Sequence, residues 1–527
     1  MGIYYEDPAL NLGFGIDPRM MPGLEQMLQR LCAYMKFSAQ NLLVYPVCFY
    51  SGLVESHDSS RGHAPDFLDA LLTVFDREGL SFMGSLNQNN LLSFDHRKLT
   101  EANVASGVLH RTPLSILNTG KPNLGGWHGT PPNFNVLHPE VQREVRENVK
   151  KILAVGKRHR SFKGIVLHIA RHSLLSLGDL KAGYNDFMIE QFEKDTGIRV
   201  PADRNDPLRG KEYYRFLTGP VKKEWIRWRC GEVAKFYRKL AGQITAERSD
   251  LKLVINTLIP MGEVESPDYC RKDFVASRVL EAGIDREMLR SPSILLQQSL
   301  YPADYRWRAG RTLRKGVYEH LRTIDQQREF YFQLEGAVHP WVHMHDRYWE
   351  SAVGDATKKK HWSDKPDPLK ADWLKEQSWR VSTLNPAGFH AMRHYLVPFR
   401  YFDVATITKG GFLIGTYGME EYLVPFSNAL RSLPNEVFCD VPSGSDGVRV
   451  RMWKGKGKTW FYAVNSSGRP AGVRIRTGKA SEITDTVSGA KKRIPESGFS
   501  LRLEPYSLRT FRTEGECGIT AETGGIP

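Results

Sequence analysis

Residues 41–50 read NLLVYPVCFY, an uninterrupted apolar run of the length of one strand. A strand with one face in solvent alternates apolar and polar residues, whereas a strand covered on both faces carries an unbroken apolar run. The run therefore predicts a strand that is buried on both sides. Residues 23–38, which precede it, space their apolar side chains at i, i+3 and i+4, which predicts an amphipathic helix.

The same alternation of strand and helix continues as far as residue 432. Apolar runs predict eight strands, at residues 3–5, 41–50, 81–86, 162–169, 251–258, 293–300, 329–335 and 404–408. Helical spacing predicts intervening helices at 23–38, 66–78, 138–157, 186–196, 210–246, 273–282, 311–324, 385–401 and 419–432. Eight such units indicate an α/β fold, a parallel (β/α)8 TIM barrel with loop insertions. A doubly wound sheet is the alternative, although neither GxGxxG nor GxxxxGK[ST] stands at a strand–helix junction.

The pattern changes after Pro442. Short segments with period-two alternation, separated by turns of Gly, Ser and Lys, predict strands at 448–453, 459–464, 471–477 and 500–503. We therefore expect a barrel over residues 1–442, a C-terminal antiparallel β-sandwich over 443–513 and a loosely ordered tail over 514–527.

The composition is that of a globular chain with more than one domain. It has 527 residues, of which 41% are hydrophobic and 25% charged. No apolar run reaches the roughly 18 residues of a membrane helix, and the N-terminus lacks the pattern of a signal peptide. We expect a cytoplasmic protein, or a secreted or periplasmic one if a signal segment has been removed. The six cysteines include no CxxC pair, which argues against a zinc knuckle or a redox motif.

The chain is basic, with 73 Lys and Arg against 59 Asp and Glu, a formal charge of +14. Such a surplus either belongs to an ordinary solvated surface or serves to attract an anionic partner. Helix-turn-helix, RNA-binding and zinc-finger signatures are missing from the sequence, so nucleic acid is the weaker choice. We expect a carbohydrate partner, with acidic and sulfated carbohydrates among the options, no membrane and no cofactor; a homo-oligomer is left open.

The carboxyl ends of barrel strands surround one pocket. At the predicted strand ends and in the loops nearby, polar and aromatic residues gather. Aromatic rings stack on sugar C–H surfaces, and amides, imidazoles and acids bind hydroxyls, so this lining favours a carbohydrate. The predicted substrate-binding residues are Tyr5, Glu6, Tyr50, Asn87, Gln88, Trp127, His168, Arg171, His172, Asn256, Tyr301, His339 and Trp341.

Glu335 is the leading candidate for catalysis. The predicted strand 329–335 is apolar and ends on this carboxylate, which would be either ion-paired with an arginine or catalytic. Glycosidases use two carboxyl groups, about 5–5.5 Å apart for retention or about 6.5–9.5 Å for inversion. Asp179 and Asp186 are the leading candidates for the general acid, and Glu6 and Glu263, which also lie near strand ends, are further candidates. Asp186 could instead cap a helix, and Asp179 could be an ordinary loop residue.

Two other classes of function stay open. His339, His343, His345 and Asp346 raise the alternative of a metal-dependent hydrolase or lyase that uses the 339–346 histidine loop, although this spacing matches no established zinc site. The lack of an evident acid favours a second alternative, a catalytically silent glycan-binding protein. Serine nucleophile chemistry is disfavoured, because no GxSxG motif is present.

Six segments carry a resemblance to known proteins: 135–141 (NVLHPEV), 162–166 (FKGIV), 183–186 (GYND), 191–201 (QFEKDTGIRVP), 225–237 (WIRWRCGEVAKFY) and 430–434 (LRSLP). They resemble the glycosyl-hydrolase-like (β/α)8 barrel family of clan-A-like glycoside hydrolases. The resemblance covers residues 40 to 440, and it implies a retaining hydrolase with Glu335 at the nucleophile position after strand seven. Strand four departs from that arrangement, because it ends in Leu167-His168-Ile169 without an Asn-Glu pair.

Overall fold

The structure is a computed structural model of the chain. It describes residues 1–6, 10, 14, 16, 23–50, 52–53, 67–95, 98–123, 133–169, 173–258, 272–300, 334–345, 388–411, 416–444, 447–478 and 481–524. By their contacts these residues fall into two compact units, each of which is described by itself. The first unit is Met1–Tyr4, Gln29–Leu42 and Leu300–Pro527, and the second is Tyr5–Leu28 and Leu43–Ser299.

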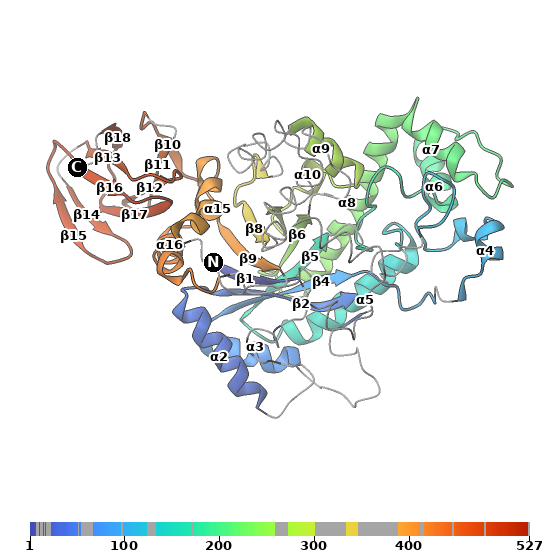
Figure 1. Cartoon of the computed structure of the whole chain (residues 1–527), viewed down its shortest axis with the longest axis horizontal. Helices are drawn as coiled ribbons and strands as arrows, with labels where there is room; N and C mark the ends of the chain where they lie inside the picture. The colour runs from blue at the N-terminus through green and yellow to red at the C-terminus, as the bar shows by residue number, and fades with distance from the viewer. Residues whose placement is uncertain are drawn as a thin grey trace, which may run out of the picture. The chain divides into compact units, whose positions relative to one another are not determined.

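Eight parallel strands form the main sheet, in the order β1-β9-β8-β7-β6-β5-β4-β2, and β1 pairs with β2 to close it (Figure 1). The predicted (β/α)8 barrel is confirmed. Its strands are β1 (Gly2–Tyr5), β2 (Leu42–Tyr50), β4 (Ser81–Gln88), β5 (Phe162–Ile169), β6 (Lys252–Leu258), β7 (Ile294–Leu300), β8 (Trp341–His345) and β9 (Thr406–Gly411). The two-residue β3 (Gly52–Leu53) pairs antiparallel with the end of β2.

The seventh barrel strand is not where we predicted it. We expected residues 329–335, but β8 pairs with β9 over Trp341–His345. Residues 329–333 lie outside the described residues, and Glu335 lies in a turn before β8, where the Ala337 amide donates to the Leu334 carbonyl at 3.0 Å. Gly336 makes this turn with a φ of 76°, a conformation that suits glycine. Both segments suit a strand locally, and only pairing with β9 distinguishes them.

Helices follow most of the strands, as predicted. The predicted helix 311–324 lies outside the described residues, and the predicted helix 385–401 is described from residue 388 as a four-residue α-helix between two 3-10 helices. One predicted helix, 210–246, is two helices, because Gly219 and Pro220 interrupt it: proline has no amide hydrogen and its ring clashes with the preceding turn of a helix. The helices of the barrel and its insertions are α2 (Leu24–Phe37), α3 (Phe67–Glu78), α4 (Glu101–Ala105), α5 (Pro139–Gly156), α6 (Asp186–Thr196), α7 (Gly210–Thr218), α8 (Lys222–Glu247), α9 (Lys272–Glu281), α10 (Arg286–Leu289), α15 (Arg393–Leu396) and α16 (Glu420–Ser432). Short 3-10 helices are η3 (Val108–Arg111), η8 (Gly388–Met392) and η9 (Val397–Arg400).

Two segments of the second unit, residues 98–123 and 173–220, pack together beside the barrel strands; we call them the insertion. They follow the carboxyl ends of β4 and β5 and contain α4, α6 and α7 (Figure 1). A β-bridge joins Leu117 to Ala182. The buried Asn185 side chain ties them further, since its amide donates to the Thr112 carbonyl at 3.2 Å and its oxygen accepts from Asn135 at 2.8 Å.

The C-terminal part of the first unit is a β-sandwich, as predicted. Its core contains Val450, Phe461, Phe511 and Ile475, all nearly or fully buried. The predicted tail is wrong in part, because β18 pairs with β13 across Val473 and Thr523. The six-stranded sheet is β10 (Cys439–Val441), β11 (Val448–Gly455), β12 (Lys458–Asn465), β17 (Ser507–Glu514), β14 (Ser481–Asp485) and β15 (Lys491–Ile494). The three-stranded sheet is β16 (Phe499–Leu503), β13 (Ala471–Thr477) and β18 (Ile519–Gly524).

Among the described residues, none of the helices has the length and apolar character needed to span a membrane.

Candidate active site

Four neighbouring strands of the second unit carry a polar residue at the same level near their carboxyl ends. His168 on β5 is in register with Asn256 on β6, and Asn256 is in register with Gln297 on β7. Asn87 on β4 follows the registered pair Leu86 and Leu167, which places it beside His168. We call Asn87, His168, Asn256 and Gln297 the polar row. All four side chains are buried, at the end of the barrel where parallel barrels hold their active sites.

Glu6, the residue after β1, joins the polar row. Its carboxylate Oε1 lies 3.3 Å from His168 Nε2, and its backbone carbonyl accepts a hydrogen bond from Asn87 Nδ2 at 3.1 Å. Only 11% of the Glu6 side chain and 1% of the His168 side chain are exposed. A carboxylate and an imidazole in hydrogen-bond reach can orient each other and share a proton, and either becomes a general acid or base when a substrate atom lies within hydrogen-bond reach of it.

Ser299 on β7 extends the site. Its hydroxyl donates to Asn256 Oδ1 at 2.7 Å, and both residues are buried. We did not predict Ser299 from the sequence. The signal was available, since Gln297, Gln298 and Ser299 form a polar run at the end of an apolar strand.

Glu335 does not lie at this end of the barrel. Barrel strands run parallel, so a residue before a strand lies at the amino end and a residue after it lies at the carboxyl end. Glu335 precedes β8, and so does His339, while Trp341 is its first residue. The expected position of Glu335 at the end of strand seven is therefore wrong. His339 and Trp341 were expected in a loop after that strand, and this placement is wrong for the same reason.

Asp186 is held in a buried ion pair inside the insertion. Arg209 Nε and Nη2 donate to its two carboxylate oxygens at 2.8 and 2.6 Å, and the Tyr213 hydroxyl donates at 3.2 Å. Burial alone would raise the pKa of the Asp186 carboxyl, but Arg209, with help from His110 and Tyr213, outweighs it and lowers this pKa. Asp186 is the first residue of α6, and Asn185 is the N-cap. The expected role as general acid has no geometric support here, because the carboxylate is committed to Arg209.

Asp179 lies in the loop after β5, where its side chain closes a turn. Its Oδ1 accepts from the Lys181 amide at 2.7 Å. Its backbone carbonyl accepts from Arg229 Nη2 at 2.9 Å, and the fully buried Arg229 also donates to the carbonyls of Ala182 and Glu281. The described contacts of Asp179 thus hold the loop, and they do not connect it with Glu6.

Two further predicted residues, Gln88 and Tyr5, contact other buried side chains of the fold. Gln88 is fully buried; its amide donates to Glu144 at 2.8 Å, and its oxygen accepts from Asn148 at 3.0 Å, both on α5. Tyr5 is also fully buried and packs edge-on against Tyr45, with ring centroids 5.8 Å apart. The described hydrogen bonds of the Gln88 side chain go to the helix α5, and its expected contact with substrate stays a prediction.

The remaining predicted residues are not placed. Trp127, Arg171, His172 and Tyr301 lie outside the described residues, and so does the side chain of Tyr50 at the end of β2. Their expected roles in substrate binding stay predictions.

The expected histidine loop is a strand. His343 lies inside β8, fully buried, with Nδ1 3.0 Å from the Thr408 hydroxyl and its ring 4.0 Å from that of Tyr4. His339 precedes the strand on the other side of Pro340, and Asp346 lies outside the described residues. Within the described part of the chain, no three His, Cys, Asp or Glu side chains are grouped as metal ligands.

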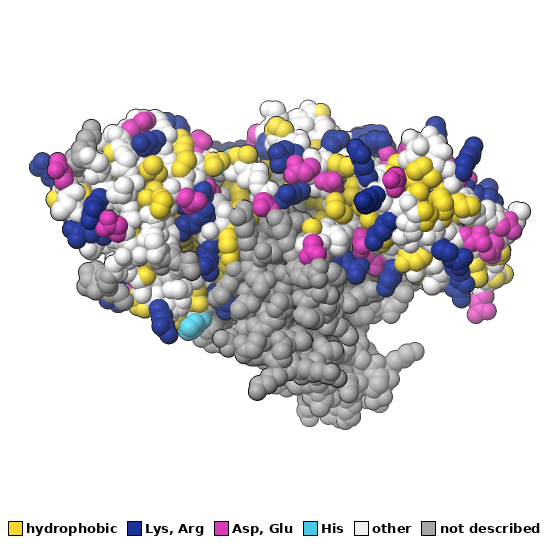
Figure 2. Space-filling model, turned by 90° about the horizontal axis from the view of Figure 1, so that it is seen from above, with side chains coloured by type: hydrophobic (Ala, Val, Ile, Leu, Met, Phe, Trp, Pro, Cys, Tyr) yellow, Lys and Arg dark blue, Asp and Glu magenta, His cyan; other side chains and the backbone are white. Residues whose placement is uncertain are grey.

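The positive charge is spread rather than gathered at the polar row. On the face seen in Figure 2, the coloured Lys and Arg side chains are interspersed with Asp and Glu. Between residues 443 and 513, fifteen Lys and Arg stand against five Asp and Glu, so most of the surplus belongs to the sandwich. Net charge alone therefore does not locate an anion site.

Comparison with known proteins gives similarity of structure without similarity of sequence. No protein-family model matches the chain, and no curated protein matches it. The α-amylase of Geobacillus thermoleovorans, solved with acarbose, is 12% identical, with a TM-score of 0.47 and coverage of 97% of both chains. The α-amylase of Anoxybacillus is 11% identical, with a TM-score of 0.44 and coverage of 98% of both. A GH30 endoxylanase of Clostridium papyrosolvens is 10% identical, with a TM-score of 0.40 and coverage of 97% of this chain and 95% of the enzyme.

These solved structures are glycoside hydrolases, and they are what the chain resembles. At such identities and TM-scores the resemblance assigns neither a family nor a substrate. The candidate site therefore rests on the residues of the polar row, Glu6 and Ser299.

Proposed function

We propose that the chain is a glycoside hydrolase that acts on a poly- or oligosaccharide, with Glu6 as one of its two carboxyl groups. The observation that supports it is the buried contact of Glu6 with His168 at the carboxyl end of the barrel strands, 3.3 Å between Oε1 and Nε2. Barrel enzymes carry their catalytic groups at this end. The net charge of +14 agrees with an anionic substrate, but most of this surplus belongs to the sandwich, so it supports the class of substrate and not the position of its site.

The polar row supplies the binding groups. The amides of Asn87, Asn256 and Gln297 can both donate and accept hydrogen bonds, as sugar hydroxyls require. His168 orients Glu6 by a hydrogen bond. The pair can then donate a proton to the leaving oxygen or accept one from an attacking water. Because these groups are buried, their hydrogen bonds act in a medium of low dielectric constant, where charge developing on the substrate is stabilised more strongly than in water.

The second carboxyl group would come from a segment that follows another strand. Among the described residues that end these strands or follow them directly, Glu6 is the one carboxylate. The 259–271 segment after β6 contains Glu263, Glu265 and Asp268, all outside the described residues. These three are the candidates we propose for the partner of Glu6.

The test is hydrolysis by the full chain. Neutral, uronic-acid and sulfated polysaccharides and a panel of aryl glycosides are incubated with the protein, and new reducing ends are measured. On the substrate found, Glu6→Gln should lower kcat by about a hundredfold or more. Glu335→Gln is the matched control, because it removes the same charge from a position before β8, and kcat should stay near that of the wild type.

Two outcomes count against the proposal. Normal turnover by Glu6→Gln would exclude Glu6 from the chemistry, and a selective loss in Glu335→Gln would favour the assignment made from sequence. Saturable binding of a polysaccharide without any product would instead support the second candidate, a silent glycan-binding protein. The observation that favours this candidate is that Glu6 is the one carboxylate among the described strand ends, whereas hydrolysis needs two carboxyl groups.

A further inference from the structure

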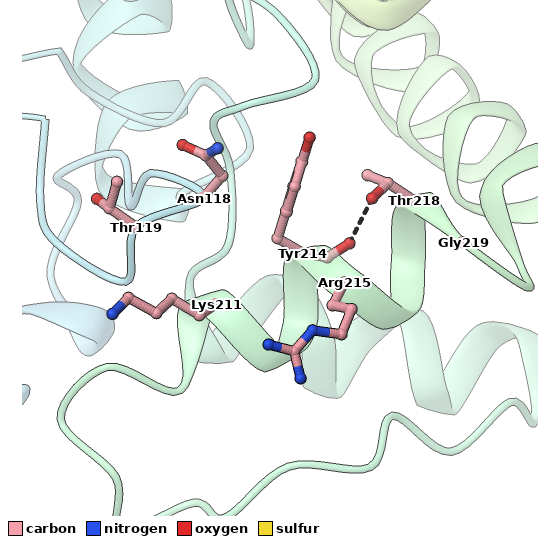
Figure 3. Close-up of a pocket in the computed structure, with 7 residues that line it drawn as sticks. All are labelled: Asn118, Thr119, Lys211, Tyr214, Arg215, Thr218 and Gly219. Atoms are coloured by element: carbon pink, nitrogen blue, oxygen red, sulfur yellow. Dashed lines mark hydrogen bonds between the residues drawn. The ribbon is translucent and has the colours of Figure 1, made fainter.

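The insertion contains an open hollow of about 420 Å³ on the side of α7 (Figure 3). Three kinds of group line it: an aromatic ring, two cations, and small polar side chains; in Figure 3 the Tyr214 ring points to one side of α7, and the Lys211 and Arg215 side chains extend in other directions. No carboxylate is among the residues that line it. They are Asn118, Thr119, Lys211, Tyr214, Arg215, Thr218 and Gly219.

The frame of this hollow is fixed by close backbone packing. Gly120 has a φ of 77°, and a Cβ there would come within 2.5 Å of the Leu208 carbonyl oxygen. A Cβ on Gly210 would lie 2.9 Å from the Gly120 Cα, so the turn at 118–120 sits directly against the start of α7. The Asn118 amide also donates to the Lys181 carbonyl at 2.7 Å. The two walls are therefore held at a set distance before any ligand binds.

Tyr214 supplies a half-buried aromatic ring. It packs edge-on against the fully buried Tyr184, with ring centroids 5.5 Å apart and an interplanar angle of 90°. In Figure 3 the Tyr214 side chain rises between Asn118 and Thr218. Such a ring combines an apolar face with a polar end, which suits the C–H surface and hydroxyls of a sugar.

Lys211 and Arg215 lie four residues apart on the same helix, and both are exposed. Like charges at this spacing destabilise a helix. Lys211 also stands in the first turn of α7, where the helix dipole disfavours a cation. Within the described part of the structure, neither side chain has a carboxylate as an ion-pair partner. An anion bound beside them would relieve both unfavourable interactions.

We propose that this hollow binds a sugar unit that carries a carboxylate or a sulfate group. In this proposal the sugar ring stacks on Tyr214. Lys211 and Arg215 bind the anionic group, and Asn118, Thr119 and Thr218 form hydrogen bonds with sugar hydroxyl groups. The proposal rests on the proposed function in taking the ligand to be a glycan. It places the recognition of the acidic group in the insertion, on segments that leave the carboxyl ends of β4 and β5, apart from the Glu6–His168 pair.

Calorimetric titration of the full chain tests this site. The background carries Glu6→Gln, so that a probe is not consumed. The probes are a galacturonic-acid oligomer, a sulfated galactose oligomer and a neutral maltooligosaccharide. Lys211→Ala with Arg215→Ala should weaken binding of at least one acidic probe about tenfold or more. Tyr214→Ala should weaken it as well, and Tyr214→Phe should keep it.

The matched control is Lys223→Ala with Arg227→Ala. These two exposed cations have the same spacing on the neighbouring α8 and do not line the hollow. Their removal should leave the affinity within about twofold. An equal loss in both double variants would show diffuse attraction and overturn the site, as would equal binding of the neutral probe or no binding of either acidic probe.

The result is separable from the proposed function. If Glu6→Gln retains normal turnover on the true substrate, the proposed catalytic role fails, and the titrations are repeated with galacturonic acid and sulfated galactose as monosaccharides, which have no glycosidic bond to cleave, so that the subsite is still tested. If turnover depends on Glu6 but the acidic probes bind no better than the neutral one, the subsite fails alone. Which acidic probe binds distinguishes a carboxylated from a sulfated sugar.

Discussion

Glu6 Oε1 lies 3.3 Å from His168 Nε2, although the two residues are 162 positions apart in the sequence. Glu6 follows the first barrel strand, and His168 is the last residue but one of β5. Both are buried, so neither can lose its partner without leaving a polar group in a poorly solvated place. We therefore expect that replacing a single atom in either side chain of this pair lowers the catalytic rate.

The Glu6–His168 pair should behave as one unit in a double-mutant cycle. Glu6→Gln and His168→Gln should each lower kcat by about a hundredfold or more, because each removes proton exchange and keeps a hydrogen-bonding amide. The double variant should be no slower than the slower single variant, since residues that act together are not additive. Steady-state kinetics on the substrate found, with thermal melts to confirm folding, measure this. Multiplicative losses would mean that the two residues act independently.

The Asp186–Arg209 ion pair should be important for stability and not for chemistry. The two side chains are 6% and 8% exposed, so Asp186→Asn would leave a buried guanidinium without its counter-charge. The free energy of unfolding should fall by about 3–5 kcal/mol, measured by urea denaturation. The control is Glu247→Gln, which breaks the exposed pair with Lys157, 38% and 45% exposed. It should cost no more than about 1 kcal/mol. A comparable loss in both would contradict the buried character of Asp186.

The same pair predicts a pH dependence. The pKa of Asp186 is lowered in the folded chain, so this carboxyl stabilises the fold fully above the unfolded-state value of about 3.9. The contribution is lost as the pH falls through the lower folded-state pKa. The difference in unfolding free energy between the wild type and Asp186→Asn should therefore shrink at acidic pH and be constant near neutrality. Urea denaturation at a series of pH values measures this difference, and one that grew on acidification would refute the assignment.

Gly164 should be intolerant of any side chain. Its φ is 134°, and a Cβ there would collide with the carbonyl oxygen of Lys252, its register partner on β6. Gly164→Ala should cost more than about 4 kcal/mol or prevent recovery of folded protein. Gly178→Ala is the control, because Gly178 also has a positive φ, 77°, but open space around the added Cβ. It should cost about 1–2 kcal/mol. Equal melting temperatures would show that β5 and β6 can separate to admit a methyl group.

Asp403 should anchor the sandwich to the end of the barrel segment in the first unit. Its carboxylate accepts from the Tyr462 hydroxyl at 2.7 Å and the Phe438 amide at 3.0 Å, and it pairs with Arg451. Asp403→Ala should destabilise this unit by about 2–3 kcal/mol, because the buried Tyr462 hydroxyl loses its acceptor and Arg451 keeps only one of its two carboxylate partners, Asp440 at 3.1 Å. Urea unfolding and limited proteolysis should both report the loss. Asp440→Ala, at a carboxylate that is 57% exposed, should cost about 1 kcal/mol or less; a loss as large as that of Asp403→Ala would argue against the anchor.

Much of the fold could be predicted because its signals are local. The apolar run at 162–169 became β5 with the predicted ends, and residues 186–196 became α6, with Gly197 in the left-handed conformation after it. The break between α7 and α8 also has a local signal, in Gly219 and Pro220. Burial pattern, capping and proline act within a few residues, so they can be recognised in the sequence.

The candidate site could be predicted only as a list of residue types at strand ends. Asn87, His168 and Asn256 were on that list, and strand register brings them together. Gln88 was on it too, but the pleat turns its side chain toward α5. Asp186 gave a clear N-terminal helix signal, yet its partner Arg209 stands 23 residues later.

Sequence by itself determined that this chain alternates strand and helix, ends in a sandwich, and carries a polar set of residues at its strand ends. Tertiary structure alone decided which carboxylate belongs to that set. The segments 329–335 and 341–345 are both apolar enough for a strand, and pairing with β9 selects the second. That choice moves Glu335 to the amino end of a strand and leaves Glu6 beside His168. Side-chain patterns report burial along one segment, whereas register depends on hydrogen bonds between segments far apart in the chain.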